Sequence, residues 1–349
     1  NSQFGRIFNG SLDQFELSGA LNWEADIWGK IRSNKRATLA SFLQTEAAKR
    51  TVQSQLVANI ASLYYQMLAT QEQIKIVEKS LKNRTESVAV IRALKDAGNV
   101  NEVAVKQTEA QQYGTELTLK ELQYNLKIME NSFCVLLNRK PSNLVKGNFY
   151  NQTLNVDLKT GIPLIMLSNR PDVVAAELSF RNSFEQVNIA RASFYPTLTI
   201  RPSVGFQSLE LRNLLSVNSI FANVISGITQ PILNSRQNRT RFEVAKANQQ
   251  KMYLQYEKTI LIAGKEISDA LALYENETEK IIIRKKQLEA LQSAANYSDE
   301  LLQYGMVNYL EVLTAKDNAL NTEISYINDK YNQLNAIVML YKALGGGQQ

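Results

Sequence analysis

Histidine is absent from this sequence and cysteine occurs once, so two common kinds of protein chemistry have almost no residues to build on. A disulfide needs two cysteines, and thiol–histidine catalysis and most transition-metal sites need histidine. The chain also contains no glycine-rich phosphate loop and no recognisable nucleophile motif. The sequence therefore predicts a protein that is not an enzyme and that binds no metal and no cofactor.

Proline is scarce as well, with six residues in a chain of 349. All six lie between positions 141 and 231, so residues 24–140 and 232–349 contain none. Proline costs about 3 kcal/mol inside a helix. Two proline-free blocks of this length indicate very long helices, and everything else must lie in the shorter segments around them.

Long apolar runs and a strong net charge are also missing. No stretch approaches the roughly 18 to 20 apolar residues that a membrane-spanning helix needs, so a membrane protein of this composition would have to cross by β-strands. The 39 basic and 33 acidic residues leave a net charge of +6 that is spread along the chain, and we predict no nucleic-acid partner. The densest basic run, residues 280–286, is interpreted as a solvated helix face with buried isoleucines.

An internal repeat organises what is present. Shifting the chain by 207 residues superposes its two halves without a gap, placing Gly98 on Gly305 and Asn101 on Asn308. One register held over more than 100 residues indicates one supersecondary unit used twice.

Apolar residues inside each copy follow a seven-residue rhythm. The positions in the first copy are Leu56, Ile60, Leu63, Met67, Ile74, Val77, Leu81, Val88 and Ile91, and those in the second are Leu310, Leu313, Leu320, Ile324, Ile327, Tyr331, Leu334, Val338 and Tyr341. The rhythm has gaps only at Thr70 and Arg84 in the first copy and at Asp317 in the second. A sustained period of about 3.5 residues is typical of helices that pack as left-handed coiled coils.

Each copy is expected to form a helix, a tight turn and an antiparallel return helix, because Gly98 and Gly305 interrupt the apolar pattern. The first long helix, residues 29–97, would measure about 100 Å at a rise of roughly 1.5 Å per residue. Helices of that length point to an extended molecule rather than to an ordinary globular domain.

Three segments alternate apolar and polar residues as half-buried strands do. Residues 197–207 place one set on a single face, namely Leu198, Ile200, Pro202, Val204 and Phe206. Residues 15–23 repeat the pattern, and residues 218–230 form a weaker third strand. A tilted strand of about ten residues crosses a bilayer, although Pro202 requires an edge or an irregularity. A strand that leads directly into a long helix, twice, is uncommon in soluble proteins.

Several motifs resemble those of the TolC-like outer-membrane efflux proteins. Residues 167–177 (LSNRPDVVAAE) are similar to the Arg-Pro-Asp signature of that family, although the residues alone also fit a plain helix start with proline and an acid in its first turn. Residues 21–29 (LNWEADIWG) and 230–239 resemble the starts of its two long helices. Residues 97–105 and 304–313 are similar to its paired periplasmic tips. The resemblance covers essentially the whole chain.

The resemblance implies the fold class, which is mixed and mainly α. Long antiparallel coiled-coil hairpins would form a periplasmic α-barrel, continuous with a trimeric transmembrane β-barrel. It also implies a homotrimer in outer-membrane lipid that extends into the periplasm and docks through a periplasmic adaptor to an inner-membrane transporter. The implied function is a passive exit duct for drugs or small toxic compounds in a tripartite efflux pump.

Four parts follow from the repeat and the resemblance together. Residues 1–138 are the first repeat, residues 139–169 an equatorial segment, residues 170–344 the second repeat and residues 345–349 a flexible tail. By the repeat, a further strand and its leading helix are expected before residue 1, and a lipid anchor, if the protein has one, would lie there too.

The candidate site residues come from the resemblance. The adaptor would dock on the tips, at Gly98, Val100, Asn101, Gly305, Val307 and Asn308. The four residues other than glycine are expected to be exposed, and the glycines also fit the simpler role of a helix stop. Glu311, six residues after the second tip glycine, would form a ring of three carboxylates at the pore constriction, or it is an ordinary solvated side chain.

Other functions stay open at this point. A metal-efflux or type I protein-secretion channel would share the architecture and its motifs. A soluble coiled-coil scaffold would share the helices but has no use for alternating strands. An enzyme would need convergent titratable residues, whereas the carboxylates of this chain are scattered over predicted helix faces.

Overall fold

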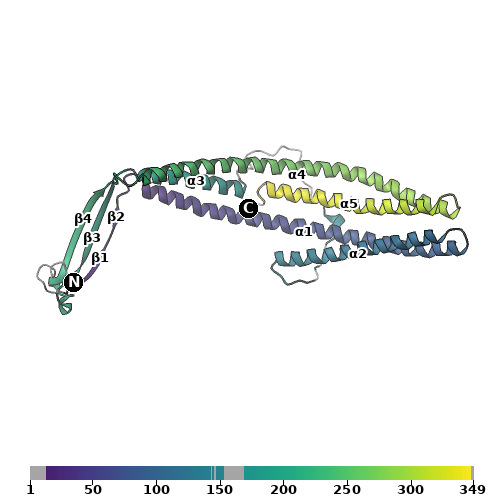
Figure 1. Ribbon diagram of the computed structural model, residues 1–349, viewed down its shortest axis with the longest axis horizontal. Coiled ribbons are helices and arrows are strands. Elements are labelled where there is room, and N and C mark those ends of the chain that lie inside the picture. The colour runs from purple at the N-terminus through teal and green to yellow at the C-terminus, as the bar shows by residue number, and fades with distance from the viewer. Residues whose placement is uncertain (1–12, 143, 145–146, 153–168, 347–349) are drawn as a thin grey trace. The chain divides into compact units, whose positions relative to one another are not determined.

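The computed structural model describes residues 13–142, 144, 147–152 and 169–346, and Figure 1 labels its elements. The helices are α1 (Lys30–Asp96), α2 (Glu102–Leu136), α3 (Pro171–Ala192), α4 (Gln237–Gln303) and α5 (Tyr309–Ala343), with short 3-10 helices η1 (Phe149–Asn151), η3 (Leu211–Asn213) and η4 (Val217–Ser219). The strands are β1 (Phe15–Ala20), β2 (Trp23–Glu24), β3 (Thr197–Ser208) and β4 (Ile220–Thr229).

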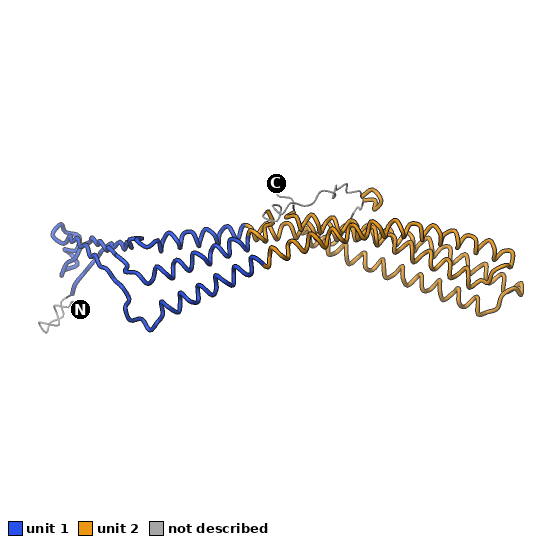
Figure 2. Tube along the Cα trace, turned by 90° about the horizontal axis from the view of Figure 1, so that it is seen from above, with its two compact units in different colours: residues 1–46, 175–257 blue, residues 47–174, 258–349 orange. Residues whose placement is uncertain are grey.

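The chain divides into two compact units, which Figure 2 colours separately. Unit 1 comprises residues 1–46 and 175–257, and unit 2 comprises residues 47–174 and 258–349. Most of the predicted equatorial segment, and residues 347–349 of the predicted tail, lie outside the described residues. Among the described helices, none combines the length and the apolar composition that crossing a membrane requires.

The helices repeat at the offset found in the sequence. Each long helix, α1 and α4, has 67 residues, and each return helix, α2 and α5, has 35. Gln237 follows Lys30 by the same 207 positions that separate the two tip glycines. The expected unit of helix, turn and return helix is therefore confirmed, with the first long helix one residue shorter at each end than expected.

Apolar seams between its helices hold unit 2 together. Met67, Val77 and Ile91 on α1 and Ile327 on α5 are almost fully buried, and all four belong to the predicted rhythm. Burying one such side chain contributes about 1.5–3 kcal/mol. Leu310, at one end of the rhythm, is exposed in the single chain, so the periodicity identified the core better than it identified the limits of the core.

The gaps in the apolar rhythm are occupied by polar contacts. Arg84 on α1 donates from Nη1 to Oε1 of Gln111 on α2 at 2.9 Å, and its Nη2 contacts Oδ1 of Asp317 on α5. Asp317 is the gap of the second copy, so the two charged interruptions of the rhythm face each other. Because a buried charge is costly without a partner, this contact lets both interruptions lie within the seam.

Unit 1 packs α3 against the first turns of α1. The buried α1 residues on this side are small, namely Ser33, Ala37 and Ala40, and small side chains let two helices approach closely. Nδ2 of Asn182 on α3 donates to Ala37 O at 2.8 Å. Arg36 binds Glu185 with 2.6 Å between Nε and Oε1, and this hydrogen bond lowers the pKa of the Glu185 carboxyl.

The sheet of unit 1 is antiparallel, with β1 and β2 on one side of β3 and β4 on the other. Residues 15–23 were expected to form one strand, but β1 ends at Ala20 and β2 begins at Trp23. The break lies opposite Pro202, which accepts a 2.9 Å hydrogen bond from Leu21 N but has no N–H to return one. The strands expected at 197–207 and 218–230 are confirmed as β3 and β4.

We predict that Gly205→Ala disrupts the pairing of β1 with β3. A Cβ at position 205 would stand 2.6 Å from Ser18 Cα and would also collide with Leu17 O, and neither is a side-chain atom that can rotate away. Overpacking of this kind costs about 1–3 kcal/mol, which urea unfolding followed by tryptophan fluorescence would measure, since both tryptophans, Trp23 and Trp28, belong to unit 1.

Gly227→Ala is the matched control, because nothing lies within 4 Å of a Cβ at that strand position. Equal unfolding midpoints for the two variants would contradict the close approach of β1 and β3.

Candidate functional site

Both hairpin turns are built around a glycine in the left-handed region. Gly98 has a φ of +78° and Gly305 one of +68°, and nothing lies within 4 Å of a Cβ at either position. Two backbone hydrogen bonds end the first helix, from Gly98 N to Lys95 O and from Asn99 N to Leu94 O, each at 2.9 Å, and equivalent bonds end the second. The backbone angle, rather than a lack of space, explains both glycines.

The asparagine that follows each glycine starts the return helix. Oδ1 of Asn101 accepts from Ala104 N at 3.1 Å, and Oδ1 of Asn308 accepts from Leu310 N at 3.1 Å. Both side chains are exposed N-caps. This capping role was not among the predictions made from the sequence, although asparagine just before an apolar periodic run is a known helix-start signal.

Val100 and Val307 were expected to be exposed, and this expectation is wrong. Both are half-buried. Val100 packs on an apolar cluster contributed by α1, α2 and α5, whose buried members are Ile91, Val105, Tyr309 and Leu313. A branched apolar side chain is more favourably placed on this cluster than in water. The exposed residues of the turns are Ala97, Gly98, Asn99 and Asn101 in the first and Tyr304, Gly305, Met306 and Asn308 in the second.

An ion pair joins the two helices of each hairpin at equivalent positions, with opposite polarity. In the first hairpin Arg92 Nη2 lies 2.6 Å from Glu109 Oε1, and in the second Lys316 Nζ lies 2.7 Å from Asp299 Oδ1. Hydrogen bonds from Lys106 and Arg92 lower the pKa of the Glu109 carboxyl. The repeat therefore keeps the interaction while exchanging the charges.

Glu311 lies in the first turn of α5 and is exposed in the single chain. Its backbone N–H donates to Asn308 O at 3.0 Å, and an acid near a helix N-terminus is favourable. Residues 296–319 carry four acids and one base, whereas residues 89–112 carry three of each, so the second turn is the acidic one. Among the described residues, no group of three or more His, Cys, Asp or Glu side chains is arranged to hold a metal ion.

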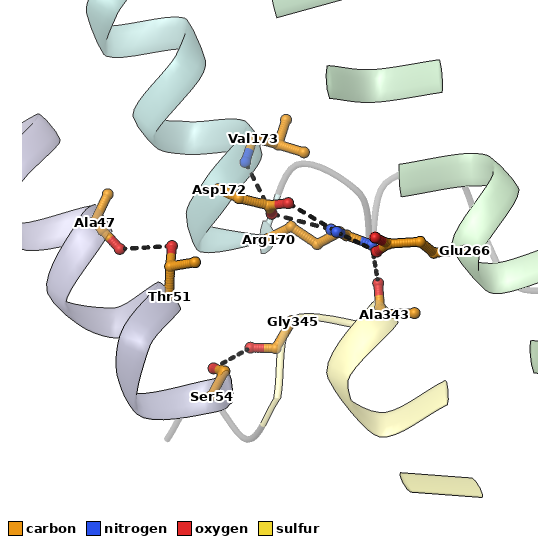
Figure 3. A network of polar contacts seen from close by, with 9 residues as sticks. All are labelled: Ala47, Thr51, Ser54, Arg170, Asp172, Val173, Glu266, Ala343 and Gly345. Atoms are coloured by element: carbon orange, nitrogen blue, oxygen red, sulfur yellow. Dashed lines mark hydrogen bonds and ion pairs between the residues drawn. The ribbon is translucent and has the colours of Figure 1, made fainter. Parts of the chain in front are cut away.

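The Arg-Pro-Asp segment forms a buried ionic junction in unit 2 (Figure 3). Arg170 is only 3% exposed, and its Nη2 donates to Oδ2 of Asp172 and to Oε2 of Glu266, each at 2.7 Å. Its Nη1 donates to Ala343 O at 3.0 Å. One guanidinium thus ties the start of α3 to α4 and to the C-terminal end of α5.

Electrostatics favour the charged forms of Arg170 and Asp172 in this junction. Burial by itself would lower the pKa of Arg170, but the hydrogen bonds to Asp172 and Glu266 raise it. Burial would likewise raise the pKa of the Asp172 carboxyl, and the Arg170 guanidinium holds it below its usual value. The helix start expected here is confirmed, with α3 beginning at Pro171, but the local pattern gave no sign of Glu266.

The densest basic run of the sequence, residues 280–286, was predicted to be a solvated helix face with buried isoleucines, and the structure differs from this prediction. Lys280 Nζ and Arg284 Nε lie 3.1 and 2.8 Å from the carboxylate oxygens of Asp329, which is 4% exposed. Ile282 and Ile283 are exposed in the single chain instead of buried. The run therefore directs two of its charges toward α5.

One face of the sheet is apolar across all of its strands. The register places Leu17 opposite Phe206, Trp23 opposite Ile200, and Pro202 opposite Val224, and directly opposite residues share a face. The apolar face comprises Leu17, Trp23, Leu198, Ile200, Pro202, Val204, Phe206, Ile220, Val224 and Ile228. The other face is mainly polar, with Glu16, Ser18, Glu24, Thr199, Arg201, Ser203, Gln207 and Asn223, and it also carries Phe221 and Ile225. Exposed apolar faces of this kind mark contact with lipid or with another protein.

Comparison with known proteins identifies one family. The family described as "Outer membrane efflux protein" matches residues 1–139 and 163–346. The cation efflux system protein CusC of Escherichia coli O6:H1 is 29% identical over 348 residues, which cover 99% of this chain and 76% of that protein. The solvent efflux pump outer membrane protein SrpC of Pseudomonas putida is 28% identical over 337 residues, which cover 96% of this chain and 71% of that protein.

Solved structures resemble the whole arrangement. A crystal structure of CusC matches with a TM-score of 0.88 at 29% identity, covering 96% of this chain and 78% of that one. The outer-membrane channel OprN matches with a TM-score of 0.90 at 24% identity, covering 96% of this chain and 81% of that one, and at that identity the likeness concerns the fold alone.

We predict that Arg170→Gln lowers the free energy of unfolding by about 3 kcal/mol, because it leaves two carboxylates and a helix-end carbonyl without their partner. The estimate is at the low end of the range for buried pairs, since the side chains of Asp172 and Glu266 are 36% and 40% exposed. Urea unfolding followed by circular dichroism would measure it. Arg181→Gln, which removes an exposed arginine from α3, the helix that begins one residue after Arg170, is the control and should change stability by about 0.5 kcal/mol or less.

The same variant has a predicted pH dependence. The lowered pKa of Asp172 contributes stability that is complete above its usual value of 3.8 and is lost as the pH falls through the folded-state value. The difference between wild type and Arg170→Gln should therefore shrink in acid. A difference that stays constant there, or a loss no larger than that of Arg181→Gln, would argue against the junction.

Proposed function

The chain belongs to the outer membrane efflux protein family, and from that membership we propose that three copies of it assemble into one passive exit duct for small toxic compounds. Family membership confirms the resemblance found in the sequence motifs and the TolC-like fold class. It also confirms the location in the outer membrane with a periplasmic extension, and the role as a non-enzymatic channel of efflux pumps. A soluble coiled-coil scaffold does not fit this membership.

The proposal of a trimer rests on the incomplete sheet of the single chain. Among the described strands, β1, β2 and β4 each pair only with β3, which leaves their outer edges without a ladder. In lipid, each unpaired backbone N–H or C=O costs several kcal/mol. Pairing edges between copies would remove that cost, place the apolar face against acyl chains, and turn the polar face toward a shared lumen.

An exposed stripe on α2 supports assembly through the helices as well. Tyr113, Leu117, Tyr124, Ile128 and Val135 follow one another at steps of four and seven residues, and each is exposed in the single chain. The steps repeat every eleven residues, a period of about 3.67 residues per turn that keeps these side chains on one face of the helix. A helix of a second copy laid along the stripe would bury it, as the closed α-barrel of the proposal requires.

The two turns are the proposed docking surface for a periplasmic adaptor, which would link the duct to an inner-membrane transporter. Gly98 and Asn101 are exposed in the first turn and Gly305 and Asn308 in the second, and the half-buried Val100 packs on the apolar cluster of the first turn. Because the second turn carries the excess of acids, a basic contact on the adaptor would favour that turn over the first.

The proposed cargo follows from the names of the relatives. These include proteins named for the efflux of solvents, toluene and antibiotics, which supports small toxic compounds. Cations are the second candidate, because CusC is named for cation efflux and is similar over nearly the whole of this chain. A ring of Glu311 carboxylates in the proposed trimer would suit that cargo, since rings of acidic side chains select cations.

The purified full chain should behave as a trimer in native mass spectrometry and should give conductance steps in planar bilayers. In the same bilayers Glu311→Gln should lower the permeability of cations relative to anions, because three carboxylates crowded at a narrow mouth attract cations. Glu300→Gln, which removes an exposed acid from α4 of the same hairpin, is the control and should change the ratio less.

A monomer without conductance would overturn the duct itself. Unchanged selectivity in conducting Glu311→Gln trimers would agree with the proposed duct but would show that Glu311 is an ordinary surface carboxylate.

The docking proposal is tested by Asn101→Asp and Asn308→Asp. Aspartate caps a helix as well as asparagine does, so stability and trimer formation should be preserved while each turn gains an exposed negative charge. Efflux in cells that contain the partner pump should fall, measured as increased sensitivity to its substrates. Asn101→Ala and Asn308→Ala provide the contrast, because each costs about 1 kcal/mol in capping without adding charge. Full efflux by both aspartate variants would show that the turns are not the docking surface.

A further inference from the structure

Exposed apolar and basic side chains lie together where the chain passes from β4 into α4. We call this group the α4 collar, and it comprises Ile232, Leu233, Arg236, Arg239 and Arg241. The two apolar side chains are 87% and 96% exposed. The three arginines are exposed too, and none forms an ion pair with any residue that the structure describes. The collar thus presents uncompensated positive charge beside bare apolar surface.

The first repeat shows what a compensated version of the same region looks like. Arg32, at the position equivalent to Arg239, is paired with Asp26 at 3.1 Å between Nε and Oδ2. The residue equivalent to Asp26 in the second repeat is Leu233, which cannot neutralise a charge. Lys30 and Arg36 at the start of α1 are also paired with carboxylates, whereas the exposed Lys35 has no ion pair among the described residues. The second repeat lacks the Arg32–Asp26 pair and has the exposed Ile232 and Leu233 where the first has Ala25 and Asp26, although the first repeat exposes Ile27 and Trp28 nearby.

The collar continues the apolar face of the sheet along the chain. Ile228 on β4 is 74% exposed on that face and precedes Ile232 by four residues. Trp23, 57% exposed, lies on the same face in the short strand that precedes α1. Tryptophan, exposed aliphatic side chains and arginine are the residues that gather where a membrane meets water.

Packing within unit 1 holds the collar in place. Nδ2 of Asn238 donates to Ser193 O at 2.7 Å, which ties the first turn of α4 to the end of α3. Phe242 meets Phe194 edge to face, with 5.9 Å between ring centroids. Arg236 has a φ of +62°, a conformation that residues other than glycine adopt rarely and that the surrounding contacts must maintain. The arginines are therefore presented by an anchored turn.

We propose that the α4 collar binds the headgroups of anionic phospholipids in the periplasmic leaflet of the membrane. The arginines contact the phosphates, and Ile232 and Leu233 enter the boundary of the acyl chains. This inference rests on the proposed function, because it needs the sheet to span the membrane. Charge complementarity and continuity with the apolar sheet face together favour a lipid over a protein partner. Three collars in a trimer would fix the depth of the duct in its bilayer.

The test compares lipids on the full chain. Purified protein in detergent is mixed with equal amounts of phosphatidylglycerol and phosphatidylcholine, and native mass spectrometry counts the lipids that each trimer retains. Wild type should prefer phosphatidylglycerol. One basic residue near an anionic surface strengthens binding about fivefold, so the triple variant Arg236→Gln, Arg239→Gln and Arg241→Gln should lose a preference of roughly a hundredfold.

Matched variants separate the collar from net charge. The triple variant Lys251→Gln, Lys258→Gln and Lys286→Gln removes the same charge from exposed positions farther along α4 and should keep the preference. Replacing all three arginines of the collar by lysine should keep it as well. Ile232→Ser with Leu233→Ser should weaken the retention of both lipids, because the acyl contacts are lost.

Several outcomes would overturn the inference. The first is that wild type retains the two lipids equally, and the second is that the control triple variant loses the preference as much as the collar variant does. The third is that inorganic phosphate abolishes lipid retention while the serine variant retains lipid as wild type does, which would indicate a site for free anions. If the variant with three glutamines forms no trimer, two other measurements test the inference. The preference for phosphatidylglycerol must persist in the variant with three lysines, and in wild type it must weaken as the salt concentration rises. Conducting trimers without a lipid preference would contradict this inference alone, whereas a monomer without conductance would contradict the proposed function.

Discussion

The apolar seams between the long helices are the interaction on which the rest of this structure depends. Intrinsic propensity gives a helix of 67 residues little of its stability, and packing along an apolar face supplies the remainder. The contact of Arg84 with Asp317 interrupts that face at one place on each side. A single paired interruption favours one alignment of the helices over slipped ones. The turns and the Arg170 junction, both in unit 2, are presented by helices that these seams hold.

The two repeats show that backbone and side-chain chemistry diverge separately after duplication. Both turns keep the glycine and the capping asparagine, because a left-handed angle and an unsatisfied helix start impose the same demand wherever they occur. Charges face no such demand. The pair Arg92 with Glu109 returns as Asp299 with Lys316. Arg32 is paired with Asp26, whereas its equivalent Arg239 has no ion pair among the described residues. A duct built from both hairpins would therefore offer each partner two chemically different surfaces.

The proposed function resides in surfaces that a single chain leaves incomplete. The sheet has unpaired edges among its described strands, one sheet face is apolar and exposed, and α2 carries an apolar stripe without a partner. Each of these would be unfavourable for an isolated soluble protein. In the proposed trimer the same surfaces become the contacts with other copies and with lipid, so the cost to one chain becomes the driving force of assembly.

The sequence by itself determined the elements, because periodicity and turn chemistry are local. The seven-residue rhythm and the glycines at 98 and 305 were enough to predict both hairpins, and strict alternation was enough to predict β3. Tertiary structure alone decided which side chains meet. It directed Val100 inward, joined Arg170 to Glu266 across 96 positions, and placed the gap at Arg84 against the gap at Asp317. The physical reason is that such contacts depend on which faces of distant helices lie against each other, and no local pattern of residues encodes that choice.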